Sequence, residues 1–244
     1  MRTWLSCAAA AAILLAVPMV AVQATSFASL LSSSERPDAD KARDADRKPV
    51  VLMNFAGVRP GLKVAELAPG GGYFTRLLTL AVGPNGHIYT GSTRPNAALT
   101  TWASAHPNIT LASVPPGESL APVPVDIVWT TQNYHDFKNQ KIGTFDAAVL
   151  TNRAAFAALK PGGVYPVADH EAAPGAGATV TSTLHRIESA TVIREVEAAG
   201  FHFEARNSML RNSADNHSLK VQESGIRGHT DQFVLRFRKP KPRR

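Results

Sequence analysis

Short apolar runs alternate with segments of helical periodicity along most of this chain. The apolar runs have strand character and lie at residues 63–68, 87–90, 109–114, 125–130 and 164–168. Helical patterns follow at residues 73–82, 96–105, 144–159 and 185–199. Two more strands are expected near residues 201–210 and 231–238, with only a loop between them. This alternation predicts an α/β fold built on a doubly wound, mostly parallel sheet of seven strands, with an antiparallel last strand.

The first 24 residues have the pattern of a cleavable signal peptide. Arg2 provides a positive start, residues 8–17 form an apolar core, and Pro18 interrupts it before small residues that would permit cleavage after Ala24. A membrane-spanning helix needs about 20 apolar residues without such a break. We therefore expect no stable membrane anchor and a mature protein that is periplasmic or secreted.

Cys7, the only cysteine, lies inside this predicted signal peptide. The mature chain would then contain no disulfide, no thiol nucleophile and no zinc–thiolate site. Residues 25–36 are expected to be a flexible leader. A charged surface helix is predicted from Pro37, followed by an apolar helix that ends at Gly57.

The net charge of +7 is concentrated at the C-terminus. Without Arg2 the charge is +6, and residues 25–235 sum to zero. The six basic residues that carry the excess are Arg236, Arg238, Lys239, Lys241, Arg243 and Arg244. A short basic end with two prolines is typical of a solvated tail, so we expect no nucleic-acid partner. The predicted domain spans residues 37–238, with a basic tail at 239–244.

A strand, a glycine turn and a helix follow one another at residues 63–82. The turn contains Gly70, Gly71 and Gly72, so a ligand could approach bare backbone and the helix N-terminus there. Glu66 precedes the turn, where its carboxylate could reach a ribose or an amino acid. A turn without any ligand would show the same pattern, so the motif alone leaves both interpretations open.

Polar side chains follow the fourth and fifth predicted strands. Asn133, Tyr134, His135 and Asp136 follow the fourth strand, and Asp169 and His170 end the fifth. Because the carboxyl ends of neighbouring parallel strands meet at one edge, these side chains should converge. Three interpretations remain open: a histidine base paired with a carboxylate, a site for Mn, Fe or Zn, or a hydrogen-bonded surface histidine.

Further polar residues are expected to have structural or pocket-lining roles. Asp126 begins the fourth strand at the opposite edge and is expected to be structural. Near the end of the chain, a second group could line an acceptor pocket or only brace it: His185, Arg186, Asn212, Asp215 and His217.

The chain resembles class I S-adenosylmethionine-dependent methyltransferases, and within them a group of exported bacterial proteins described as predicted methyltransferases. The resemblance covers residues 35–240, and its matching segments are ELAPGGGYFTRLL, VDIVWTTQNYHDF, FAALKPGGVYPVADH, LHRIESATVIREVEAAGF and TDQFVLRFRKP. It implies a Rossmann-like methyltransferase fold, S-adenosylmethionine as cofactor and a small-molecule acceptor.

The resemblance also implies cofactor-binding residues. The family's acidic–glycine motif falls on Glu66, Ala68, Gly70 and Gly72, with Ala68 in place of the first glycine, and the implied set is Glu66, Ala68, Gly70, Gly71, Gly72, Ser92 and Asn133. The family normally has an acidic residue at the end of the second strand, where this chain has Thr90-Gly91-Ser92. A serine hydroxyl there can still bind ribose.

On the same basis His135 is implied as a general base for methyl transfer, oriented by Asp136 or a nearby carboxylate. Tyr134, Asp169 and His170 complete the implied catalytic group, to which no resident metal is assigned. An alternative remains, because S-adenosylmethionine is made in the cytosol and this protein is expected to leave it. The chain could then be a non-catalytic exported ligand-binding protein on a methyltransferase fold.

Overall fold

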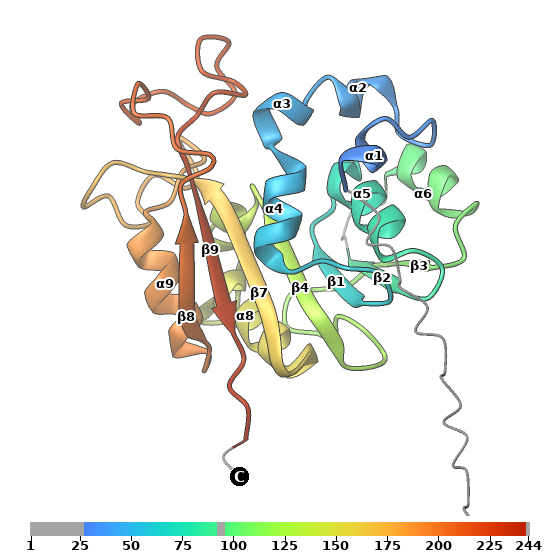
Figure 1. Ribbon diagram of the computed structural model, residues 1–244. Helices are drawn as coiled ribbons and strands as arrows, with labels where there is room; N and C mark the ends of the chain where they lie inside the picture. The colour runs from blue at the N-terminus through green and yellow to red at the C-terminus, as the bar shows by residue number, and fades with distance from the viewer. Residues whose placement is uncertain (1–26, 92–95, 243–244) are drawn as a thin grey trace, which may run out of the picture.

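A seven-stranded sheet organises the computed structural model, which describes residues 27–91 and 96–242 (Figure 1). The strands are β1 (Lys63–Leu67), β2 (His87–Gly91), β3 (Ile109–Ala112), β4 (Val125–Thr131), β7 (Leu159–His170), β8 (His202–Asn207) and β9 (Gln232–Arg238). Their order is β3-β2-β1-β4-β7-β9-β8. The predicted signal peptide and Ser92 lie outside the described residues.

All strands of the sheet run in one direction except β9, which is antiparallel to both β7 and β8. A separate hairpin consists of β5 (Lys141–Ile142) and β6 (Phe145–Asp146). The predicted fold class, a mostly parallel α/β sheet with an antiparallel last strand, is confirmed. Its parallel strands end at the upper edge in Figure 1, and this edge is where a doubly wound sheet binds ligands.

Helices cover both faces of the sheet. They are α1 (Phe27–Leu31), α2 (Asp38–Lys41), α3 (Asp44–Arg47), α4 (Pro49–Ala56), α5 (Tyr73–Val82), α6 (Ala97–Ala103), α7 (Tyr134–Lys138), α8 (Ala147–Ala158) and α9 (Ser189–Ala198). One apolar cluster packs α4 and α5 on Trp129 of β4. The other packs α8 and α9 on Tyr165 and Phe237. No helix among the described residues is long and apolar enough to cross a membrane.

The strand β7 begins earlier than predicted. Residues 160–163 were expected to lie between the helix at 144–159 and the strand at 164–168, but the register steps from Val125 opposite Leu159 to Ile127 opposite Val164. Residues 160–163 therefore form an irregularity within the strand, where Gly162 has φ +81°. Residues 160–163 are Lys-Pro-Gly-Gly, so the apolar pattern begins only at Val164 and misses this first part.

The described part of the N-terminal segment, residues 27–47, folds into three short helices, which corrects the expected leader and surface helix. Phe27 packs in the core, and Arg36 is almost fully buried, with its guanidinium 2.8 and 2.7 Å from the Asp44 carboxylate. The predicted charged helix is two short helices, α2 and α3. Asp40 faces inward and accepts a hydrogen bond from Arg76 at 2.7 Å, so the charges fix this segment to α5.

Two of the basic C-terminal residues, Arg236 and Lys239, are also anchored, against the expectation of a solvated tail, whereas Arg243 and Arg244 lie outside the described residues. Arg236 donates to the carbonyl of Phe55 at 2.7 Å. Lys239 donates to the carbonyls of Phe156 and Leu159 at 2.6 and 2.7 Å. A cluster of charges in the sequence does not show that each cation has a carbonyl partner elsewhere in the fold.

Candidate functional site

The glycine turn between β1 and α5 borders an open cavity of about 880 Å³. Ala68, Gly70 and Gly72 have φ values of +47°, +54° and +82°. A Cβ on Gly70 or Gly71 would meet no atom within 4 Å, whereas one on Gly72 would lie 2.5 Å from Leu99. Gly70 and Gly71 therefore leave space for a ligand, and Gly72 is required by packing.

Glu66 lies at the base of this cavity. It is 4 % exposed, and its Oε2 accepts a hydrogen bond from Thr75 at 2.6 Å. Burial raises the pKa of Glu66 to about 7, against the opposing effects of Thr75 and Arg76. A carboxyl that ionises near neutral pH can respond to a cation placed in the cavity.

Asn133 holds the turn in place. Its side-chain amide donates to the carbonyls of Leu67 and Ala68, both at 3.1 Å, and Thr130 donates to its oxygen. A smaller cavity of about 100 Å³ continues beyond Ala68 and is lined partly by the apolar Val114. The implied cofactor residues other than Ser92 are thus brought together around one turn.

Two arginines of the N-terminal segment, which sequence reasoning missed, cover the same cavity. Arg47 lies 4.6 Å from the ring centre of Tyr73 and donates to Gln132 at 2.6 Å. Burial and the charge of Arg43 lower the pKa of Arg47 to about 10. The signal in the sequence was the four-residue spacing of Arg43 and Arg47, which places both on one side of a helical segment.

His135 lines a second cavity, of about 660 Å³. Four residues line both this cavity and the first: Arg43, Arg47, Gln132 and Asp136. The ring of His135 is 3 % exposed. Its Nδ1 donates to Asp169 at 2.8 Å, and its Nε2 lies 3.3 Å from Asp136.

These two carboxylates determine the charge of the ring. Burial lowers the pKa of His135, but the charges and hydrogen bonds of Asp169 and Asp136 outweigh it and raise the pKa to about 10. The imidazole of the free protein therefore carries a proton at neutral pH.

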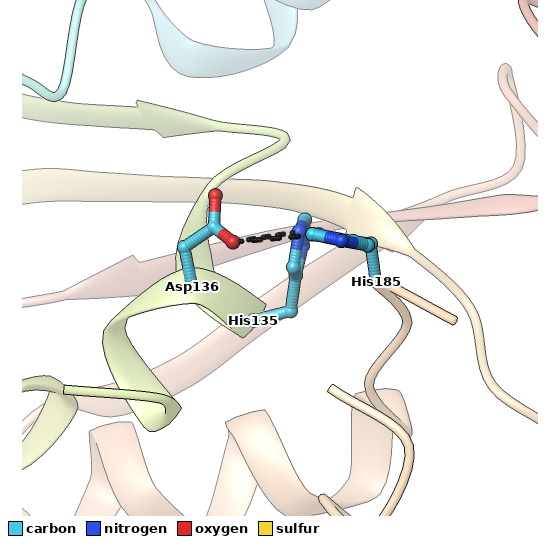
Figure 2. Close-up of side chains that lie close together, drawn as sticks. All are labelled: His135, Asp136 and His185. Carbon is cyan, nitrogen blue, oxygen red and sulfur yellow. Dashed lines mark ion pairs between the residues drawn. The ribbon is translucent and has the colours of Figure 1, made fainter. Parts of the chain in front are cut away.

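Two more histidines line this second cavity. His185, on the loop between β7 and α9, has its Nδ1 3.5 Å from Asp136, and its ring centre is 5.3 Å from that of His135 (Figure 2). His170 lies with its ring centre 6.0 Å from that of His135, and its Nδ1 is 2.7 Å from the Thr230 hydroxyl. Burial lowers the pKa of His170 to about 4, so this ring is neutral at physiological pH.

Two of the implied catalytic residues touch neither cavity. Tyr134 is fully buried on the opposite face of the sheet, where its hydroxyl donates to Glu195 at 3.0 Å and accepts from Asn152 at 2.8 Å. This burial contradicts the implied place of Tyr134 in the catalytic group, because α7 turns successive side chains to different sides. Asp169 is fully buried and reaches the second cavity through its neighbours: it holds Nδ1 of His135 and accepts the backbone N–H of His170, both at 2.8 Å.

Of the remaining polar residues, some line the second cavity and others hold the surrounding loops in place. His185 lines the cavity, whereas the adjacent Arg186 is fully buried and pairs with Asp215 at 2.8 Å. Asn212 and His217 both contact Asp231, at 2.8 and 3.0 Å. Asp126 accepts from the backbone of Lys63 and from Lys160, at the far edge of the sheet. These contacts hold the loops and leave His185 as the member of this group that faces ligand space.

No protein-family model and no curated protein matches the chain. Solved structures do match its fold. A SAM dependent methyltransferase from Aquifex aeolicus is 14 % identical with a TM-score of 0.59, over 82 % of this chain and 95 % of that one. The [4+2]-cyclase SpnF is 16 % identical with a TM-score of 0.62, over 86 % of each chain.

A third solved structure contains ligands. It is the 1,6-didemethyltoxoflavin-N1-methyltransferase of Burkholderia thailandensis, with bound 1,6-didemethyltoxoflavin and S-adenosylhomocysteine. It is 16 % identical with a TM-score of 0.58, over 88 % of this chain and 87 % of that one. The chain therefore has the fold of S-adenosylmethionine-dependent methyltransferases. Because one of these structures is a cyclase, the fold alone does not establish the reaction.

Proposed function

We propose that this protein is a methyltransferase that uses S-adenosylmethionine and acts on a small-molecule acceptor after export from the cytosol. The observation that carries the proposal is the pair of adjoining cavities, one on the glycine turn and one on His135, with Gln132 and Asp136 in their common wall. A methyl donor and an acceptor must meet in this way for direct transfer.

The residues of the first cavity fit the cofactor. Gly70 and Gly71 leave room at the turn, Glu66 can face a cationic group, and Arg47 can face a carboxylate. Thr90, the residue before the last one of β2, has a buried hydroxyl without a hydrogen-bond partner in the described part of the chain, near the position where the family has an acidic residue. When bound, S-adenosylmethionine supplies a methyl group to a nucleophile of the acceptor.

Within this proposal His135 takes the proton that the acceptor releases, and Asp169 is the positioning residue that holds its ring. The free ring is protonated at neutral pH, because Asp169 and Asp136 raise its pKa to about 10. Transfer that depends on His135 as a base is therefore favoured at alkaline pH.

The alternative is a non-catalytic binding protein on the same fold. It is supported by the lack of a carboxylate on Thr90 or Gly91 at the end of β2. Both proposals require a ligand at the glycine turn, but only the enzyme transfers a methyl group.

Calorimetric titration of the purified mature chain with S-adenosylmethionine tests the proposal. One saturable site per chain is expected, and S-adenosylhomocysteine should compete for it. Methyl transfer is then sought with the radiolabelled cofactor and a panel of small hydroxyl and amine acceptors. Binding without transfer would favour the non-catalytic protein, and no binding of either compound would refute both the cofactor and the methyltransferase.

A further inference from the structure

Three side chains place possible metal-ligating atoms around one point in the second cavity. Nε2 of His135 and Nδ1 of His185 lie 3.3 and 3.5 Å from the same Oδ1 of Asp136. One ligating atom from each residue fits within a mutual separation of 4.8 Å. Figure 2 shows the three side chains converging, two from α7 and one from the loop that carries His185.

The two separations from Asp136 match those of atoms that share one ion. Ligands bound at about 2.1 Å in tetrahedral or octahedral geometry lie about 3–3.5 Å from one another. Small rotations of two rings and one carboxylate would complete the geometry, since Asp136 is half exposed and has room to turn.

Asp169 provides the support that a ligating histidine needs. It is fully buried and holds Nδ1 of His135 at 2.8 Å, which leaves Nε2 directed toward Asp136 and His185. Histidine ligands of metal ions commonly bind a carboxylate through their other nitrogen, and this contact fixes the ring and makes it more basic.

The surroundings also suit a reactive ion rather than a closed structural one. All three residues line the 660 Å³ cavity, so coordination positions remain for water or for an acceptor atom.

We propose that His135, Asp136 and His185 bind one divalent first-row transition-metal ion, such as Zn²⁺, Mn²⁺ or Fe²⁺, with open positions that face the second cavity. Two nitrogen ligands disfavour Mg²⁺ and Ca²⁺, which prefer oxygen. The ion would polarise an acceptor oxygen as a Lewis acid. The ion would occupy Nε2 of His135, the nitrogen that a general base would use. His135 therefore cannot act as the base in the metal-loaded protein.

The test is a metal titration that needs neither cofactor nor acceptor, so its outcome is separate from that of the proposed function. The untagged mature chain is stripped with a chelator and titrated with Co²⁺, followed by calorimetry and visible absorption. One ion per chain is expected, with the absorption bands of nitrogen and oxygen coordination, and Mg²⁺ should not displace it.

Variants locate the site. His185→Ala and Asp136→Asn should each weaken Co²⁺ binding by more than tenfold, and the positioning variant Asp169→Asn by about 10–100-fold. His202→Ala, which changes an exposed histidine on β8, is the matched control and should bind as wild type. Thermal unfolding confirms that each variant is folded.

Two results would overturn the metal site. One is the lack of stoichiometric binding for Co²⁺, Zn²⁺ and Mn²⁺ alike. The other is equal Co²⁺ affinity in the wild type and in folded His185→Ala and Asp136→Asn.

Discussion

Asp169 holds His135 at two points: one carboxylate oxygen accepts the backbone N–H of His135, and the other faces its Nδ1, both at 2.8 Å. The first contact fixes the start of α7 against the end of β7, and the second fixes the plane of the ring. One buried acid therefore sets both the place and the orientation of this side chain, whether it serves as a base or as a ligand.

If His135 acts in methyl transfer, His135→Ala should lower turnover by about 10²–10⁴-fold, the usual size of general-base assistance. Affinity for S-adenosylmethionine should change little, because His135 lines only the second cavity. Turnover is measured by radiolabelled methyl transfer and affinity by calorimetry, with His202→Ala as the control. Loss of cofactor affinity instead would make His135 a binding residue.

Gly71→Val should abolish or strongly weaken cofactor binding. A Cβ at Gly71 meets no protein atom within 4 Å and φ is not in the left-handed region, so the fold should tolerate the side chain while the cavity is filled. Gly70→Val fills the same cavity but adds backbone strain, because φ at Gly70 is +54°.

Gly225→Val is the matched control for Gly71→Val. It also adds a side chain to open space at ordinary φ, and Gly225 lines neither of the two cavities. Equal calorimetric affinity in folded Gly71→Val and Gly225→Val would show that no ligand approaches this turn.

Glu66→Gln should remove a pH dependence of stability. Burial raises the pKa of Glu66 to about 7 from an ordinary 4.5, so between these values the folded state holds a proton that the unfolded state has lost. The wild type should therefore lose stability as pH rises from about 4.5 to 7, by about 3 kcal/mol in total.

Denaturant unfolding of both proteins at several pH values from 5 to 8 measures the free energy of unfolding. Other titrating groups contribute equally to both proteins, so the difference between them reports on Glu66. The free energy of unfolding of Glu66→Gln should increase relative to that of the wild type as pH rises to about 7. Above pH 7 the difference between the two proteins should stay constant. Parallel curves over the whole range would mean that the buried carboxyl ionises with an ordinary pKa.

Asp215→Ala should destabilise the fold by about 3–5 kcal/mol, because it leaves the Arg186 guanidinium buried without its counter-ion. The two side chains are 0 and 2 % exposed and 2.8 Å apart. Asp38→Ala breaks a solvent-exposed pair with Lys41 and should change stability little. Chemical unfolding compares the two, and an equally small effect of both would show that Arg186 finds another partner.

Protein recovered from a producing cell should begin near Thr25, if residues 1–24 are a signal peptide as the sequence predicts. Intact-mass spectrometry of the periplasmic and cytosolic fractions measures this. A soluble cytosolic protein that retains Met1 would contradict export, and would also remove the difficulty of cofactor supply.

The sequence predicted the sheet and the glycine turn because both depend on local patterns. Strand periodicity and the run from Glu66 to Gly72 are readable without knowing what packs against them. The position of His135 beside Asp169 was also predictable, since β4 and β7 end at the same edge. The contact at Nδ1 could not be predicted, because it depends on the turn that leads into α7.

The errors have a common physical origin. Arg47 and Lys239 look solvated in the sequence, yet each has a partner that is distant along the chain: Arg47 donates to Gln132 at 2.6 Å, and Lys239 donates to the carbonyl of Phe156 at the same distance. Charge patterns show which residues carry charge, whereas burial depends on tertiary contacts. Tyr134 illustrates the reverse case, since adjacency to His135 did not place it on the same side.

The common wall of the two cavities has a thermodynamic consequence. Arg47, Gln132 and Asp136 face both spaces, so a ligand that reorients them in one cavity changes what a second ligand meets in the other. Such linkage is reciprocal: occupancy of the His135 side alters affinity at the glycine turn by the same factor as the converse. Donor and acceptor would then bind cooperatively or antagonistically, without any movement of the sheet itself.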